Sequence, residues 1–251
     1  MFMGCENGGR VRGKGFLIIV LLGGIGGLGY RYLPSYYNPF APLQLADPPG
    51  WITTFKLQRL TLSQCRELLT AANQQGLISS QPVADSTGEC PLSHVVRVRD
   101  FGQVKLSSSF LASCPLALRS ALFVEQQAKP LTETWMKRRL TRIEHLGSYA
   151  CRNIYHRPDA RRSEHASAEA LDVSAEALDV SAEALDVSGF QLSDGRKITV
   201  LRGWGREETG PWLRAMLNAS CHYYGNGLGP DYNAAHANHF HLGMRGYGVC
   251  R

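Results

Sequence analysis

Two short segments of this sequence carry side chains that could bind a metal ion. The first holds His165 and Asp172, and the second, about 65 residues further on, holds His236, His239 and His241. Together they offer a carboxylate and four imidazoles, the oxygen and nitrogen ligands that Zn²⁺ prefers. Because the two segments lie far apart in the chain, a folded domain must bring them together.

The first segment runs into a perfect repeat. The heptapeptide Ser-Ala-Glu-Ala-Leu-Asp-Val occurs at 167–173, 174–180 and 181–187. Identity of all three copies indicates a recent duplication, because solenoid repeats are longer and vary between units. Three aspartates, Asp172, Asp179 and Asp186, therefore occupy equivalent places. Asp172 keeps the short spacing to His165, so we predict that Asp172 is the ligand and that 174–187 is an inserted duplication.

The N-terminal residues predict export. Residues 1–14 include Arg10, Arg12 and Lys14, and residues 15–30 carry no charge and include the apolar run from Phe16 to Leu22. A basic segment followed by an apolar one is typical of a signal peptide or signal anchor. No Ala-x-Ala-like cleavage site follows, which favours an uncleaved anchor at 15–31 and a domain on the periplasmic side of the inner membrane. The proline-rich stretch 32–50 predicts an extended linker before a domain at 51–251.

The cysteines agree with an oxidising compartment. Cys5 precedes the apolar run, and six cysteines follow it: Cys65, Cys90, Cys114, Cys151, Cys221 and Cys250. An even number in an exported chain predicts three disulfides, although the sequence does not choose among the possible pairings. No Cys-x-x-Cys pair is present, so thiolate ligation of zinc is disfavoured.

The remaining pattern predicts an α+β domain in which helices flank an antiparallel sheet. Helical patterns cover about 61–73, 113–127, 131–140 and 207–222, with Thr61 and Ser113 as N-caps. Strand patterns cover 94–98, 143–151 and 197–201. The formal charge of +6 is scattered along the chain. Without a basic helix or an aromatic platform, nucleic acid is not an expected partner.

Several motifs, taken in order, resemble known proteins. They are Gly147-Ser-Tyr-Ala-Cys-Arg152, Ser163-Glu-His-Ala, Ala170-Leu-Asp-Val, Ser188-Gly-Phe, Leu228-Gly-Pro-Asp-Tyr-Asn-Ala-Ala-His236 and His239-Phe-His-Leu. Over roughly 50–251 the chain resembles the bacterial extensin-like C-terminal family. More distantly it resembles the LAS group of zinc peptidases, which includes hedgehog-like domains and the penicillin-insensitive murein endopeptidase.

The resemblance implies a role for each motif residue. His165, Asp172 and His241 would hold Zn²⁺, with water in an open fourth position. His236 and His239 would be catalytic, one moving a proton and the other stabilising the oxyanion, since Asn238 replaces the glutamate base of many relatives. Arg152 would bind a substrate carboxylate or carbonyl oxygen through its fixed donor fork.

The expected function is zinc-dependent hydrolysis of peptide bonds in peptidoglycan, between or next to D-amino acids. Two positions depart from the common motifs: Ala168 replaces a glycine, and Gly243 replaces an aspartate of many relatives. Together with the repeat, they support an alternative, a non-catalytic module that binds peptidoglycan or the envelope and retains the peptidase fold.

Overall fold

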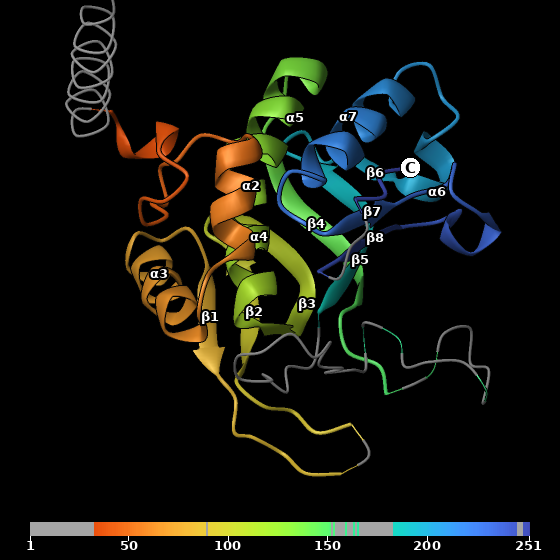
Figure 1. Ribbon diagram of the computed structural model, residues 1–251. Helices are drawn as coiled ribbons and strands as arrows, with labels where there is room; N and C mark the ends of the chain where they lie inside the picture. Colours follow the sequence, from red (N-terminus) through yellow and green to blue (C-terminus); the bar gives the residue numbers. More distant parts are fainter. Residues whose placement is uncertain are drawn as a thin grey trace, which may run out of the picture.

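A sheet of eight strands with helices packed on one face forms the body of the protein (Figure 1). A computed structural model describes residues 33–88, 90–151, 153, 159, 163, 165, 183–244 and 248–251. The strands are β1 (Ser79–Pro82), β2 (Val95–Phe101), β3 (Val104–Ser113), β4 (Leu140–Gly147), β5 (Ala184–Leu192), β6 (Lys197–Thr199), β7 (Asn226–Leu228) and β8 (Phe240–Gly243). Their order is β1-β2-β3-β4-β5-β8-β7, and β6 also pairs with β5.

The helical elements lie before β1, between β3 and β4, between β6 and β7, and between β7 and β8. They are η1 (Ser35–Tyr37), α2 (Trp51–Gln58), α3 (Leu62–Gln74), α4 (Cys114–Phe123), the π-helical η2 (Val124–Ala128), α5 (Lys129–Met136), α6 (Val200–Gly203), α7 (Gly210–Ser220) and η4 (Ala234–His236). The α+β prediction is therefore confirmed, with helices flanking a sheet.

The sheet is mixed, whereas the sequence predicted an antiparallel one. Strands β3 and β4 run parallel, with Leu106 opposite Ile143, and the other pairs are antiparallel. A parallel pair needs a crossover connection of a dozen residues or more. Here α4, η2 and α5 form that crossover, and α4 packs on β2 and β3 while α5 packs on β4.

Local signals in the sequence predicted two helix starts. Thr61 forms a capping box with Gln64 at the start of α3, and the Ser113 hydroxyl accepts a hydrogen bond from Leu116 N at the start of α4. A hydroxyl N-cap satisfies a backbone N–H that has no partner within the helix. Both caps are confirmed.

The proline-rich segment is part of the domain, not a free linker. Leu43 is buried in the core, and the buried Asp47 carboxylate lies 2.8 Å from Lys56 Nζ on α2. Gln126 Nε2 donates to the carbonyl oxygens of Leu45 and Asp47. These contacts require the 33–50 backbone to follow one path across α2 and η2, which the proline pattern alone did not reveal.

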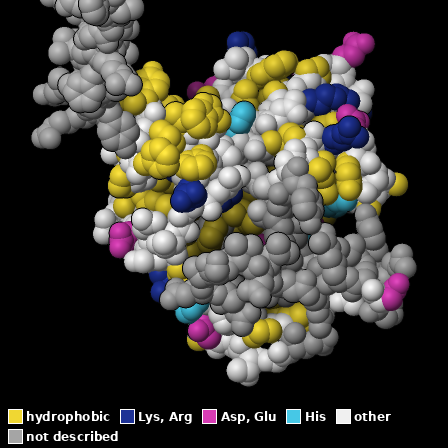
Figure 2. All heavy atoms as spheres, in the orientation of Figure 1, with side chains coloured by type: hydrophobic (Ala, Val, Ile, Leu, Met, Phe, Trp, Pro, Cys, Tyr) yellow, Lys and Arg dark blue, Asp and Glu magenta, His cyan; other side chains and the backbone are white. Residues whose placement is uncertain are grey.

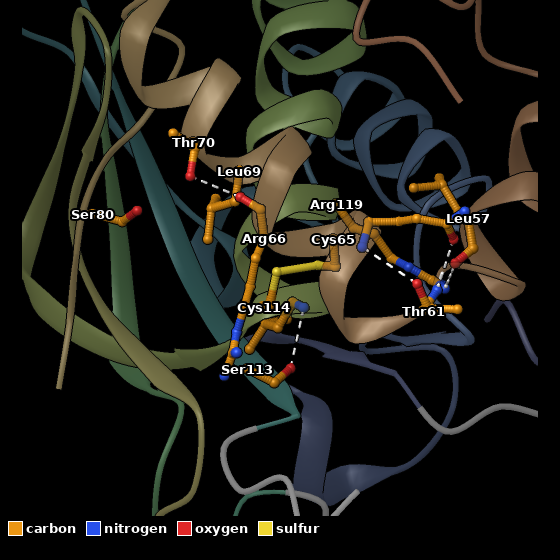
Figure 3. The surroundings of a disulfide bond; sticks show 12 residues. Leu57, Thr61, Cys65, Arg66, Leu69, Thr70, Ser80, Ser113, Cys114 and Arg119 are labelled. Carbon is orange, nitrogen blue, oxygen red and sulfur yellow. Dashed lines mark hydrogen bonds between the residues drawn. A yellow bond between two sulfur atoms is a disulfide. The ribbon is translucent and has the colours of Figure 1, made fainter. Parts of the chain in front are cut away.

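Three disulfides form, as predicted, and the structure gives their pairing: Cys65–Cys114, Cys90–Cys151 and Cys221–Cys250. Figure 3 shows Cys65–Cys114, which joins α3 to the start of α4 beside Arg119. The buried Arg119 guanidinium donates to the carbonyl oxygens of Leu57 and Tyr223, near the ends of α2 and α7. Cys5 lies outside the described residues.

No helix among the described residues is long and apolar enough to cross a membrane. The segment 15–31, which the sequence predicts to be an anchor, lies outside the described residues.

Candidate metal centre

Two of the candidate ligands are cross-strand partners. Asp186 on β5 pairs with His241 on β8. Leu185, Val187, Phe240 and Leu242, their neighbours in sequence, are buried in the core. Successive side chains of a strand point to opposite faces of a sheet. The aspartate and the histidine therefore share the face of the sheet that points away from that core.

The third candidate, His165, is bound by the short segment that follows β4. Its Nδ1 lies 2.9 Å from the carbonyl oxygen of Ser148, and its own carbonyl accepts a hydrogen bond from Ala150 N. Because the carbonyl can only accept, Nδ1 donates to it, and the ring turns Nε2 towards Asp186 and His241. A backbone carbonyl on the outer nitrogen is a common way to orient a metal-binding histidine.

Residues 148–151, which contact His165, are themselves fixed at several points. The Ser148 hydroxyl donates to the Leu111 carbonyl oxygen on β3, and the Tyr149 hydroxyl donates to the Cys90 carbonyl oxygen. Cys151 then closes the disulfide with Cys90. The position of His165 therefore depends on contacts with β3 and with the loop before β2.

The three side chains meet at the spacing that a zinc ion requires. His165 Nε2 lies 3.3 Å from His241 Nδ1 and 3.2 Å from Asp186 Oδ2, and His241 Nδ1 lies 3.0 Å from Asp186 Oδ1. Ligands about 2.0–2.1 Å from a tetrahedral zinc are about 3.3–3.4 Å apart. The two imidazole nitrogens and the Asp186 carboxylate, which turns one oxygen towards each histidine, thus form a group of suitable size and chemistry for a metal ion.

The electrostatics of the cluster keep its aspartate charged. Burial opposes ionisation of Asp186, but hydrogen bonds and charge interactions with His165 and His241 outweigh it and hold its pKa well below the usual range. Asp186 is therefore a carboxylate at neutral pH, which is the form that binds metal.

The structure brings Asp186 to the two histidines in the place predicted for Asp172. Asp172 and Asp179 lie outside the described residues. The residues after the repeat explain why Asp186, and not an earlier aspartate, occupies this place. Strand β5 continues there through Gly189 and Phe190. A Cβ on Gly189 would come within 2.7 Å of the Ile198 carbonyl oxygen on β6, and Phe190 is buried in the core.

A shift of β5 by one or two repeats would break both contacts. With Asp179 in the site, Ala182 would take the place of Gly189 and Glu183 would take the place of Phe190. The first change places a methyl group against backbone, and the second buries an unpaired charge, which is strongly unfavourable. A shift to Asp172 has the same consequences. Residues 184–187 are thus part of the central sheet and not of an insertion. The additional copies of the repeat therefore precede residue 184 in the sequence.

The two other histidines of the C-terminal motif lie beside the cluster. His236, in η4, has its ring centre 5.8 Å from that of His241, and His239 Nε2 lies 3.7 Å from Asp186 Oδ1. Neither belongs to the three-residue metal cluster. Their roles as auxiliary catalytic histidines stay a prediction.

Two asparagines orient the auxiliary histidines. Asn233 Oδ1 accepts hydrogen bonds from Ala235 N and from His236 Nδ1, 2.7 Å away, so His236 presents an unprotonated Nε2. Asn238 Oδ1 lies 2.7 Å from His239 Nδ1. Burial, and then the charges of His241 and His239, lower the pKa of His236 to about 4. The sequence motif gave Asn238 only as the residue in place of a glutamate base, and it gave no role to Asn233.

A pocket of about 430 Å³ opens onto the cluster. Its walls come from the end of β4 with the segment after it, from Ala235 and Asn238, and from His165, Asp186 and His239. Arg152, the predicted substrate-binding residue, lies outside the described residues.

Comparison with protein families accounts for most of the chain. The family described as Extensin-like protein C-terminus matches residues 63–181 and 178–251. The chain belongs to this extensin-like C-terminal family. The two matched segments meet inside the repeat, so the family pattern covers both sides of it. No curated protein and no solved structure matches the chain.

Removing two of the three repeats is expected to leave the metal cluster intact in this extensin-like domain. Deleting 167–180 gives the same sequence as deleting 174–187, and either deletion shortens the connection from His165 to the aspartate of β5 from 20 residues to 6. The smaller closure entropy should raise the free energy of unfolding by about 1 kcal/mol. Denaturant unfolding and zinc titration of the deletion variant test this. Loss of zinc binding would mean that the repeats themselves build the site.

Proposed function

We propose that this protein is a zinc-dependent peptidase that hydrolyses peptide bonds of peptidoglycan, at or next to D-amino acids. The observation that carries the proposal is the cluster of His165, Asp186 and His241, in which the two histidine nitrogens lie 3.3 Å apart and each lies 3.0–3.2 Å from one oxygen of the Asp186 carboxylate. We further propose that the domain is exported and held on the periplasmic side of the inner membrane by residues 15–31.

The ligand set favours a catalytic over a structural site. Structural zinc sites are closed by four protein ligands, whereas catalytic ones have three and keep one position open. Among the described residues the cluster has three members, His165, Asp186 and His241, and the first two line the pocket, so an ion held there would be open to a substrate in the pocket. When bound, zinc would supply Lewis-acid activation of a water molecule and of the scissile carbonyl group.

The auxiliary histidines are suited to proton transfer and charge stabilisation. His236 is neutral at pH 7 because its pKa is lowered to about 4, and Asn233 holds its Nδ1–H, which leaves Nε2 able to accept a proton. His239, at the wall of the pocket, can donate a hydrogen bond to an oxygen that gains charge during attack. A positioned acid or base contributes about 10²–10⁴-fold to the rate.

The substrate class comes from the resemblance to LAS peptidases and from export, not from the pocket itself. Three disulfides suit a protein that works outside the reducing cytoplasm. In this proposal Arg152 would bind a carboxylate or carbonyl oxygen of the stem peptide. The broader LAS and hedgehog-like relationship of the fold belongs to the same proposal.

The function is tested by digestion of cross-linked muropeptides with the full chain, followed by mass spectrometry. The full chain is needed because residues 33–50 pack into the domain. We expect zinc-dependent cleavage that His241→Ala abolishes and that His222→Ala, a change at an exposed histidine outside the cluster, leaves unchanged. A folded, zinc-loaded chain that binds muropeptides but cleaves none would instead be the non-catalytic module.

A further inference from the structure

The first described residues carry an unusual concentration of exposed hydrophobic side chains. Of the nine large hydrophobic side chains that are exposed in the described part of the chain, five fall between residues 33 and 51. We call these five the aromatic face: Leu33, Tyr36, Tyr37, Phe40 and Trp51. Figure 2 shows hydrophobic side chains gathered over this region, where η1 and α2 lie in Figure 1. Phe40 is 76 % exposed and Trp51 is 71 % exposed.

The backbone beneath the aromatic face is held firmly. Lys56 Nζ on α2 lies 2.8 Å from the Ser35 carbonyl oxygen and 2.8 Å from Asp47 Oδ2. Thr53 Oγ1 donates to the Pro48 carbonyl oxygen, and Phe40 packs edge-on against Phe55. Contiguous exposed apolar surface on an ordered backbone usually marks an interaction site.

The chemistry of the face suits the boundary between lipid and water. Tyrosine and tryptophan are enriched at membrane interfaces, where the ring is among lipid chains and the polar group is in the headgroup layer. Arg59, at the exposed end of α2, lies with its guanidinium 5.2 Å from the Phe55 ring centre and can face anionic headgroups. Lys56, whose ammonium group lies beneath the face, is paired with Asp47.

The sequence before the aromatic face indicates that its binding partner is a lipid bilayer. Residues 15–30 carry no charge and end three residues before Leu33. A helix of 16 residues is about 24 Å long, which is shorter than the roughly 30 Å hydrocarbon core of a bilayer. A short apolar segment must be compensated by flanking groups at the interface, and the aromatic face is the next part of the chain.

We propose that the aromatic face lies in the headgroup layer of a lipid bilayer and holds the domain directly against the membrane. The metal cluster is carried by β5 and β8, which Figure 1 places on a different side of the molecule from η1. Seating the aromatic face on the membrane would therefore leave the pocket open to the aqueous space, where a polymeric substrate lies.

Quenching of tryptophan fluorescence by brominated lipid tests this contact. The full chain is incorporated into phosphatidylglycerol-containing vesicles with bromine near the top of the acyl chains. Trp135→Phe provides the background, because Trp135 is exposed outside the face, and Trp204 and Trp212 are buried. We expect brominated lipid to quench this background protein, and we expect Trp51→Phe to remove most of that quenching.

A second pair of variants tests the face without changing a tryptophan. In the same background, Phe40→Asp should reduce the quenching of Trp51, and Leu201→Asp, an exposed leucine on α6, should not. Circular dichroism establishes that each variant is folded. The proposal is overturned if the protein does not co-sediment with vesicles, if Trp51 is not quenched, or if cross-linking shows a second copy covering the face. Muropeptide cleavage is measured separately, so its absence would not affect this result.

Discussion

Replacing Asp186 with asparagine is expected to abolish zinc binding and muropeptide hydrolysis together. Asparagine keeps the size of the side chain but removes the negative charge between His165 and His241, which lie 3.2 Å and 3.0 Å from the carboxylate oxygens. Loss of a partner that only orients a ligand costs about 10–100-fold in metal affinity. Loss of the ligand itself should exceed this range, as measured by competition with a chromophoric zinc chelator.

The repeat supplies two matched controls for this experiment. Asp172→Asn and Asp179→Asn make the same change within the same heptapeptide. Both variants should bind zinc and cleave muropeptides as the unchanged chain does, because only Asp186 is followed by the glycine and phenylalanine that β5 requires. If Asp172→Asn removed the metal and Asp186→Asn did not, the ligand assignment would be wrong.

Removing the Cys90–Cys151 disulfide is expected to reduce both stability and metal affinity. Changing both cysteines to serine should lower the free energy of unfolding by about 2–5 kcal/mol. The segment that ends at Cys151 also positions His165 through Ser148 and Ala150. We therefore expect zinc affinity to fall by about 10–100-fold, as for other changes in the groups that orient a ligand.

The Cys65–Cys114 disulfide provides the control, since it joins α3 to α4 and touches none of the three cluster residues (Figure 3). The two bridges span 49 and 61 residues, so their chain-entropy contributions differ by only about 0.2 kcal/mol. Replacing Cys65 and Cys114 with serine should cost similar stability while zinc affinity is unchanged. Equal loss of affinity in both double variants would show that general destabilisation, and not the position of His165, is responsible.

Much of the local structure could be predicted because its signals are local. Thr61 and Ser113 cap helices through residues three positions away, and the family resemblance implied His165 and His241, which the structure places beside an aspartate of the repeat. The choice of Asp186 could not be made from the identical repeats. It depends on the contact of Gly189 with Ile198, which follows from the pairing of β5 with β6.

Long-range contacts also explain two other differences between the structure and what the sequence predicted. The proline pattern of 32–50 indicated an extended linker, and it gave no sign that Asp47 would pair with Lys56 or that Leu43 would enter the core. The parallel pairing of β3 and β4 depends on where the crossover helices return to the sheet. Such packing is determined by the whole domain, so windows of a few residues do not contain it.

Anomalous diffraction at the zinc edge, from crystals of the zinc-loaded full chain, tests the central claim most directly. We predict one zinc ion about 2.0–2.2 Å from His165 Nε2, the Asp186 carboxylate and His241 Nδ1, with no fourth protein ligand. A zinc ion closed by His239 as a fourth ligand, bound through Asp172, or found away from these three residues would contradict the proposed open catalytic site.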